Sequence, residues 1–537
     1  MNKELRFVTL IMMDDIPRNF WYRLLETVPG TVTWLILLGP IILSFWFPRA
    51  VAIFITIYVL LWFLRALKSS IFLIHSYFKS KRLEQLNWEH ILSFFSDSPP
   101  HAHTKFEKQI MERTSALWQR GQFKKSADVY HVVIMPTYKE EKEILESSIE
   151  ALAKVDFPLE RIIFVLATEE RDRMRAETNA AYLQRRFSGI FGQFHHIMHP
   201  SNLPNELPAK GANISYACKK IAALLKDRGI PHDDVLVTTL DADNRPSPTY
   251  FSNLTYHYLM QFDRGRKSYQ PLSFFYNNIW DVPFANRLIA LANTFWYLSE
   301  SGESYHLFNA SAYAQSLDTL VAIDFWSRHT IVEDLHQYWR TYFYFRGDHE
   351  MVPLFVPVYQ DALQNKTYFT SLVGQYKQLR RWAWGASETP YVILKTIKER
   401  RSIPIFKTLH RFGYMAYLHV MWSTAPIIIL LNKLIPTVLN PQFAHSIFAY
   451  NLGQIFNVIF TVMLVGIISS LWISTLSVPR PKGRFASLQF ASLVIQWLLI
   501  PFVTIMYGAI PAIDAQTRLM LGNKLGFEVT EKIRKIT

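Results

Sequence analysis

Two aspartates separated by one residue are the sharpest chemical feature of this sequence. Asp241 and Asp243 follow the apolar run 235–240, which predicts a buried strand. Carboxylates at this spacing can share a hard divalent cation, Mg²⁺ or Mn²⁺, with substrate phosphates. Such a cation would neutralise a diphosphate leaving group. The alternative is a solvated loop in which Asp243 caps the helix expected near Pro246. Because the pair follows a buried strand, we favour the metal and phosphate interpretation.

A second acidic pair, Glu333-Asp334, precedes another predicted helix. A functional carboxylate at this place would be a general base that removes a proton from an acceptor hydroxyl. The alternative is structural, because the helix macrodipole favours negative charge in the first turn of any helix.

A third group, Gln378, Arg381 and Trp382, shares one face of a predicted helix just before the C-terminal apolar runs. The guanidinium of Arg381 could bind a diphosphate as a fork, and Trp382 could offer a flat face to a sugar ring. An interfacial tryptophan beside a basic collar near lipid headgroups explains the same residues equally well.

The elements expected to position these groups alternate between strands and helices over residues 130–270. Apolar runs predict strands at 131–135, 161–167, 194–198 and 235–240, with amphipathic helices between them. This order predicts a mostly parallel α/β sheet, whose ligands bind beyond the carboxyl ends of the strands. In addition to the aspartate pair, those ends carry Thr137, Glu140, Glu169 and Glu170. The sequence has no glycine-rich dinucleotide fingerprint and no Walker-type phosphate loop.

Composition points to a membrane protein. Of the 537 residues, 50% are hydrophobic and 19% are charged, below the ~25% charged residues of a typical soluble domain. This excludes a disordered chain, and the single cysteine, Cys218, excludes a disulfide framework. The net charge of +14 indicates a basic surface, but we find no nucleic-acid-binding module. Membrane segments are predicted at 31–47, 50–66, 412–434, 447–478 and 486–513.

The distribution of Lys and Arg predicts the orientation of these segments. Basic residues gather after the second segment, before the third, and at 480–484, whereas 434–450 contains none. The positive-inside rule places the N-terminus, the central domain and the 480–484 loop in the cytoplasm. Three later crossings would leave the C-terminus outside, yet its basic tail favours the inside, so five and six crossings both stay open. We expect an integral multi-pass protein of the plasma (inner) membrane.

These observations divide the chain into seven regions. They are a cytoplasmic N-terminus (1–30), a transmembrane hairpin (31–66), a linker with interfacial helices (67–128), a catalytic domain (129–395), a basic interfacial segment (396–411), a C-terminal transmembrane region (412–513) and a cytoplasmic tail (514–537).

Together these elements resemble the membrane-embedded family 2 glycosyltransferases, which include cellulose, hyaluronan and poly-N-acetylglucosamine synthases. The matching motifs, in chain order, are Pro136-Thr137-Tyr138, Asp241-Ala242-Asp243, Val332-Glu333-Asp334 and Gln378…Arg381-Trp382. The tail segment Phe527-Glu528-Val529-Thr530-Glu531-Lys532 looks like the Phe-x-Val-Thr-x-Lys gating loop of bacterial cellulose synthase. The resemblance runs from about residue 30 to the end. It implies an α/β GT-A-like cytoplasmic glycosyltransferase domain inserted between N-terminal and C-terminal transmembrane helices.

The resemblance also implies a role for each matching residue. Asp334 would be the catalytic base, and Asp243 together with Asp241 would hold Mg²⁺ or Mn²⁺. The implied nucleotide- and donor-binding residues are Thr137, Glu140, Glu169, Lys210, Asp241, Arg381, Phe527, Thr530 and Lys532. The implied acceptor-binding residues are Glu333, Gln378 and Trp382. One departure concerns the nucleobase, because residues 167–172 replace the family's Asp-Asp-Gly-like turn, with Glu169 or Glu170 in its place.

The implied reaction is inverting transfer of a sugar from a nucleotide-sugar donor, expected to be a UDP-sugar, to a growing polysaccharide that is exported processively. The expected partners are the donor, a polysaccharide or lipid acceptor, membrane lipids and an export partner, but no nucleic acid. One alternative is non-processive transfer to a membrane lipid or lipid-linked acceptor. Another is a nucleotide-sensing transporter, although the 447–478 run lacks the ionisable residues that transport sites often carry.

Overall fold

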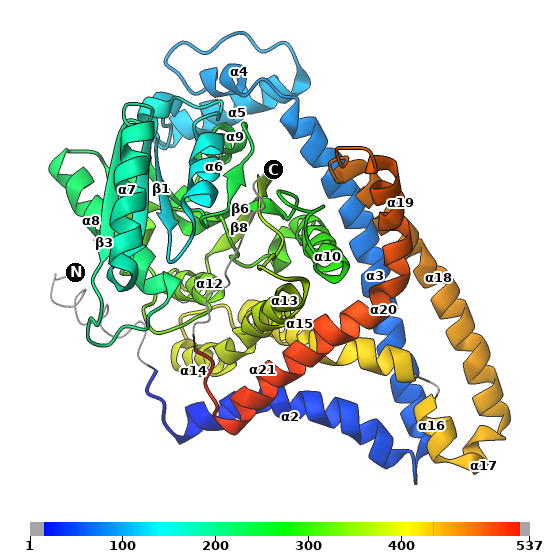
Figure 1. Cartoon of the computed structure of the whole chain (residues 1–537). Coiled ribbons are helices and arrows are strands. Elements are labelled where there is room, and N and C mark those ends of the chain that lie inside the picture. Colours follow the sequence, from blue (N-terminus) through cyan, green and yellow to red (C-terminus); the bar gives the residue numbers. More distant parts are fainter. Residues whose placement is uncertain (1–15, 433, 527–537) are drawn as a thin grey trace.

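The computed structural model describes residues 16–432 and 434–526 (Figure 1). An α/β domain occupies the middle of the chain, and long apolar helices from both ends of the chain lie beside it (Figure 1). Residues Phe527, Thr530 and Lys532 of the predicted gating loop lie outside the described residues.

The described residues form an eight-stranded sheet in the order β3-β2-β1-β4-β7-β6-β8-β5. The strands are β1 (Tyr130–Pro136), β2 (Ile162–Glu169), β3 (Gln193–His199), β4 (Val235–Thr239), β5 (Arg245–Pro246), β6 (Lys267–Phe274), β7 (Ala314–Ser316) and β8 (Glu350–Tyr359). The parallel arrangement predicted for the first four strands is confirmed. The other half is mixed, because β7 runs antiparallel to both β4 and β6, and β5 runs antiparallel to β8. The sheet is therefore less uniformly parallel than the sequence predicts.

The three inner strands of the parallel half are buried on both faces. β1, β2 and β4 are nearly continuous apolar runs, as expected for strands covered by helices on either side. Ile214 and Ile221 of α8 (Lys210–Asp227) pack on one face, and Leu145 and Ile149 of α6 (Lys142–Leu152) pack on the other. The apolar helix faces predicted from the sequence are thus the faces that cover the sheet.

Further helices surround this domain. They are α4 (Trp88–Ser93), α5 (Lys105–Gln119), α7 (Arg173–Phe187), α9 (Tyr250–Leu259), α10 (Phe284–Ser301), α11 (Leu317–Ala322), α12 (Glu333–Tyr344), α13 (Tyr368–Ala383) and α14 (Thr389–Glu399). Figure 1 shows α10 and α13 on the side of the domain that faces the apolar helices. The residues predicted for catalysis lie at the beginnings of α8 and α12 and near the end of α13.

Five helices in the described ranges are long and apolar enough to cross a membrane, which indicates a multi-pass membrane protein. They are α2 (Phe20–Leu43), α3 (Pro48–Glu84), α15 (Ile405–Leu431), α18 (Ile447–Ser477) and the composite helix Ala486–Leu521. The composite helix joins α19 (Ala486–Gln496), the 3₁₀ turn Trp497–Leu499, α20 (Ile500–Val503), the π-helical turn Thr504–Ala509 and α21 (Ile510–Leu521). Two short helices, α16 (Leu434–Leu439) and α17 (Pro441–Ala444), connect α15 to α18.

The first two helices are longer than the predicted segments 31–47 and 50–66. α2 begins at Phe20, where the side chain of Asn19 accepts a hydrogen bond from the Tyr22 amide at 3.0 Å. α3 has 37 residues and is about 55 Å long at 1.5 Å per residue. This exceeds the ~30 Å of a hydrocarbon core. The backbone hydrogen bonds of α3 continue past its apolar run, so the helix continues as well and reaches the α/β domain.

Polar contacts fix α2 against the C-terminal helices. The hydroxyl of Thr33 in α2 lies 2.9 Å from that of Ser423 in α15, and it also donates to Gln516 in α21. At its N-terminal end, Arg23 donates to the carbonyl of Leu519, near the end of α21, at 2.7 Å. A cation satisfies the last carbonyls of a helix and complements its macrodipole. The N-terminal and C-terminal apolar helices therefore form one packed group (Figure 1).

Candidate active site

Lys210 lies at the centre of a cluster of carboxylates that come from two other segments of the chain. Its Nζ is 3.0 Å from Oδ1 of Asp241, 3.3 Å from Oε1 of Glu333 and 3.9 Å from Oδ1 of Asp334. Burial alone would lower the pKa of Lys210, but these carboxylates outweigh it and hold the pKa well above its usual value. Lys210 is therefore a permanent cation that neutralises part of this acidic cluster.

The fold brings this cluster together at the carboxyl ends of the parallel strands. Asp241 lies two residues after the end of β4, Lys210 is the first residue of α8, and Asp334 lies in the first turn of α12. The loop before α12 approaches α8 closely, because a Cβ on Gly211 would lie 2.5 Å from the Ser327 carbonyl oxygen. The same Cβ would lie 3.2 Å from Cβ of Glu333. Glycine at 211 is thus required for the distance between the lysine and the second acidic pair.

We expect Gly211→Ala to separate α8 from the loop that carries the second acidic pair. The added methyl group overpacks a backbone contact, so the free energy of unfolding should fall by about 1–3 kcal/mol. Gly413→Ala is the matched control, since a Cβ on Gly413 would meet nothing within 4 Å. Thermal unfolding of the purified proteins in detergent measures both. Equal stability of the two variants would contradict the close approach.

Asp334 is partly exposed to the cavity, and the pKa of its carboxyl group is raised. Its side chain is 23% exposed, and among the described residues no hydrogen bond reaches its Oδ1. Burial is the main cause that raises the pKa of Asp334 to about 7, and the neighbouring Glu333 and Asp241 add to it. Lys210 and Arg381 act in the opposite direction. A carboxylate with a pKa near neutrality is suited to accept a proton and to release it again.

The two aspartates of the predicted metal site line the same cavity. Asp241 is held by Lys210 and by Ser311, whose hydroxyl donates to Oδ2 at 2.8 Å. Asp243 is buried, and its Oδ2 accepts the amide hydrogen of Asp361 at 2.8 Å. Within residues 16–432 and 434–526, no group of three or more His, Cys, Asp or Glu side chains would hold a metal. The residues present fit a hard cation that takes the rest of its oxygen ligands from a diphosphate and water.

The third predicted group lines this cavity as well. Gln378, Arg381 and Trp382 all line it from the last turns of α13. Trp382 packs with its ring centroid 6.3 Å from that of Phe275. The neighbouring Arg380 points elsewhere and pairs with Asp514 of α21 at 3.0 Å. Of the two adjacent arginines, only Arg381 therefore lies on the cavity.

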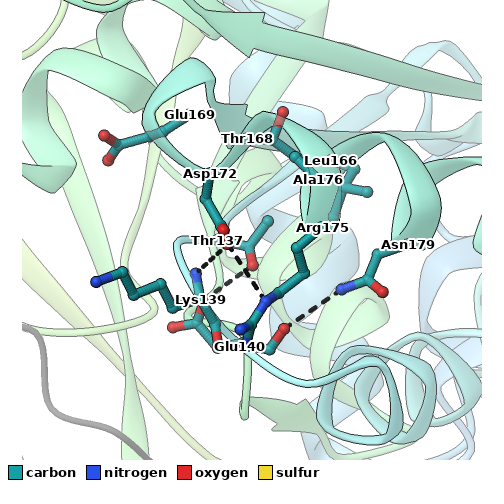
Figure 2. A pocket seen from close by; sticks show the side chains of 10 residues that line it. All are labelled: Thr137, Lys139, Glu140, Leu166, Thr168, Glu169, Asp172, Arg175, Ala176 and Asn179. Carbon is teal, nitrogen blue, oxygen red and sulfur yellow. Dashed lines mark hydrogen bonds and ion pairs between the residues drawn. The ribbon is translucent and has the colours of Figure 1, made fainter.

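A smaller pocket beyond the ends of β1 and β2 contains Thr137, Glu140 and Glu169 (Figure 2). Thr137 donates to the Glu140 carboxylate at 2.8 Å. Glu169 points away from that pair (Figure 2), and its carboxylate pairs with Arg171. Glu170, the other predicted substitute for the missing turn, accepts from the Ser201 amide at 2.8 Å and does not line the pocket. The structure brings Thr137 and Glu140 together, whereas Glu169 and Glu170 are turned toward other partners.

Lys139 in this pocket was not predicted from the sequence. Its φ of 71° lies in the left-handed region, which costs a side-chain-bearing residue roughly 1–2 kcal/mol. The surroundings hold this conformation, because Asp172 accepts the Lys139 amide hydrogen at 3.1 Å and Arg175 donates to its carbonyl at 2.7 Å. Asp172 belongs to the 167–172 segment that departs from the family pattern. This departure was the only sign in the sequence that the pocket would involve other residues such as Lys139.

Ser311 and Gln360 are further cavity residues that the sequence did not reveal. Ser311 donates to Asp241, and the Gln360 amide donates to Ser311 at 3.4 Å. Both residues are far from the aspartate pair in sequence and carry no motif, so only the fold brings them together. They fix the orientation of the Asp241 carboxylate.

The carboxylate cluster, Thr137, Glu140 and the third predicted group all line one large cavity. Its volume is about 880 Å³, and it is lined by Lys210, Asp241, Asp243, Asp334 and Arg381 on the side of the α/β domain. Its remaining walls come from α10, α13, α15 and the composite helix Ala486–Leu521. A single chamber thus joins the charged cluster to the apolar helices.

Comparisons with known proteins give structural neighbours alone. No protein-family model and no curated protein matches the chain. The mannosyltransferase PcManGT from Pyrobaculum calidifontis, solved with GDP-Man and Mn²⁺, has a TM-score of 0.37 and 13% identity over 78% of this chain and 98% of that chain. Residues 1–349 of S. aureus TarS, solved with UDP-GlcNAc, have a TM-score of 0.33 and 12% identity over 74% of this chain and 94% of that chain. The first neighbour is a mannosyltransferase and both were solved with a nucleotide-sugar, but likeness at this level does not assign an activity.

Proposed function

We propose that this protein is a membrane glycosyltransferase that moves a sugar from a nucleotide-sugar donor to an acceptor hydroxyl with inversion. One observation carries the proposal. One cavity around Lys210 is lined by the strand-end aspartates, by Asp334 with its raised pKa, and by the guanidinium of Arg381. A diphosphate leaving group, a reacting sugar and a hydroxyl to be deprotonated need these groups together.

The proposed step is a single displacement at the anomeric carbon. Asp334 accepts the proton of the acceptor hydroxyl while the hydroxyl oxygen bonds to the anomeric carbon. The bond between that carbon and the diphosphate oxygen breaks, and the nucleoside diphosphate leaves with the electron pair. Arg381 binds the departing diphosphate, and Trp382 offers the flat face of its ring to a sugar. Fixed charges in a cavity shielded from water stabilise the leaving group more strongly than solvent would.

We assign a cation to the aspartate pair. Asp243 would be its ligand, and Asp241 would contact both the cation and the nucleotide. When bound, Mg²⁺ or Mn²⁺ would neutralise charge that develops on the leaving diphosphate. Thr137 and Glu140 would lie beside the nucleobase, while Glu333 and Gln378 would contact the acceptor. In the family resemblance, Phe527, Thr530 and Lys532 would cover the nucleotide.

We place the α/β domain in the cytoplasm and the apolar helices in the plasma (inner) membrane. The basic flanks of the apolar segments support this orientation. The cytoplasm is also where nucleotide-sugars would be available to the site. Transfer to a growing polysaccharide with export is the reaction that the resemblance suggests.

The pKa of Asp334 predicts the pH dependence of turnover. Asp334 must be ionised to accept a proton, so turnover should fall as the pH drops below about 7. Lys210 lowers this pKa, so Lys210→Met should raise it and move the acid limb to higher pH. Lys219→Met, an exposed lysine of the same helix, is the matched control. Turnover at saturating donor is measured against pH. An acid limb that stays in place in Lys210→Met would contradict the coupling.

A donor screen tests the proposed function. The full-length protein in phospholipid vesicles is incubated with labelled UDP-, GDP- and dTDP-sugars and either Mg²⁺ or Mn²⁺. We expect one donor to release its nucleoside diphosphate and to pass its label to a membrane-associated product. Binding of nucleotides without any sugar release, from every donor and in native membranes as well as vesicles, would support a nucleotide-sensing protein instead.

A further inference from the structure

The far end of the 880 Å³ chamber lies among the apolar helices. Its walls there come mainly from α10, α15 and the composite helix, with Trp62 and Arg65 of α3 and Ser470 of α18 at its edge. The lining side chains in this region include Leu288, Ile289, Trp422, Ile500, Val503 and Tyr507. The chamber therefore changes from charged to largely apolar within one continuous space.

This lining is poorly suited to a polysaccharide. A sugar chain carries hydroxyls along its whole length, and each hydroxyl that is buried without a partner costs about 1–3 kcal/mol. An alkyl chain in the same space gains from every methylene removed from water. The volume is within the range of about 300–1,000 Å³ of typical small-molecule sites. Its charged end would hold the donor, and its apolar end is left for the acceptor.

The composite helix both lines the chamber and carries exposed apolar side chains. In the composite helix, Leu498 is 80% exposed and Phe502 is 57% exposed on the outer side. Val503 and Tyr507 line the chamber from the inner side of the same helix. This segment is also irregular, with a 3₁₀ turn at Trp497–Leu499 and a π-helical turn at Thr504–Ala509. Such turns occur frequently at functional sites.

The charges at the reacting end restrict the head of this molecule. Glu333 and Asp334 lie beside the position where an acceptor would be deprotonated. A lipid phosphate would bring further negative charge to this place, and it would need no base to make it nucleophilic. A neutral hydroxyl requires the base and avoids the repulsion.

We propose that the chamber binds the acyl or alkyl chain of a neutral lipid whose free hydroxyl is the acceptor. The hydroxyl would lie at Asp334, and the chain would pass Trp382 to lie between α10, α15 and the composite helix. The inference rests on the proposed glycosyltransferase function, and it selects a lipid acceptor over a growing polysaccharide. The balanced step is the displacement described above, with the lipid oxygen as the nucleophile.

Photolabelling tests the inference without relying on transfer. The full-length protein is placed in phosphatidylcholine vesicles that contain a diacylglycerol with a diazirine near one chain end. After irradiation, mass spectrometry locates the labelled residues. We expect label on Trp422, Val503 and Tyr507, in addition to the outer residues Leu498 and Phe502. Unlabelled diacylglycerol should compete for the inner sites, whereas a soluble oligosaccharide should not.

Two variants provide matched changes on the two sides of the composite helix. Val503→Trp fills the chamber and should reduce inner labelling, and lipid glycosylation, about tenfold or more while donor binding is kept. Leu498→Trp on the outer side should change none of these. Label confined to the outer side, or displaced from the inner side by the oligosaccharide, would overturn the inference. If donor turnover persisted in that case, the proposed glycosyltransferase function would still stand. If the wild-type protein bound no nucleotide-sugar donor, the proposed function itself would be contradicted.

Discussion

Asp334→Asn is expected to lower turnover by about 10²–10⁴-fold while leaving donor affinity nearly unchanged. Asparagine has almost the shape of aspartate, but it cannot accept the proton of the acceptor hydroxyl. The substitution also removes a half-buried carboxylate whose pKa is raised to about 7, so the fold should not be weakened. Donor binding by calorimetry and turnover by release of nucleoside diphosphate separate the two effects.

Asp324→Asn is the matched control for this variant, because it makes the same chemical change on a side chain that is 40% exposed and pairs with Arg328. It should behave like the wild-type protein. If Asp334→Asn lost donor binding as severely as turnover, Asp334 would be a donor ligand and the base would have to be another group.

Asp243→Asn is expected to remove the metal dependence of donor binding. In the wild-type protein, Mg²⁺ or Mn²⁺ should tighten binding by about 100-fold or more, since a metal contact to a diphosphate is worth several kcal/mol. The amide oxygen of asparagine can still accept the Asp361 amide hydrogen that Asp243 accepts at 2.8 Å. The loss would therefore reflect the missing carboxylate charge and not a damaged fold.

Titration of a UDP- or GDP-sugar with and without the metal measures this effect. Asp97→Asn, an exposed aspartate that pairs with Lys125, should retain the full metal dependence. Equal metal dependence in Asp243→Asn and the wild-type protein would refute the assignment of this residue as the metal ligand.

The sequence predicted the parallel half of the sheet because that half has a simple signal. Buried strands covered by helices read as continuous apolar runs, and β1, β2 and β4 are such runs. The mixed half lacks this signal. β7 has three residues, while β6 and β8 contain prolines and a register shift between Gln270 and Leu272. Proline removes a ladder hydrogen bond and obscures the strand pattern.

The site was partly readable for a related reason. Asp241, Asp334 and Arg381 lie at strand or helix ends that the sequence pattern could locate, and the structure brings all three to one cavity. Their partners could not be read in this way. Ser311 reaches Asp241 across 70 positions of sequence, and the strained backbone of Lys139 depends on Asp172. Such contacts arise from the packing of distant segments and leave no local pattern.

The central claim is a single displacement in which Asp334 deprotonates the acceptor, and the configuration of the product tests it most directly. The donor found in the screen is labelled with ¹³C at its anomeric carbon and followed by NMR in vesicles that contain the full-length protein. The account predicts that an axial donor linkage is replaced by an equatorial linkage in the product, and that Asp334→Asn nearly abolishes this signal. A product that keeps the axial linkage would contradict single displacement and, with it, the role of Asp334.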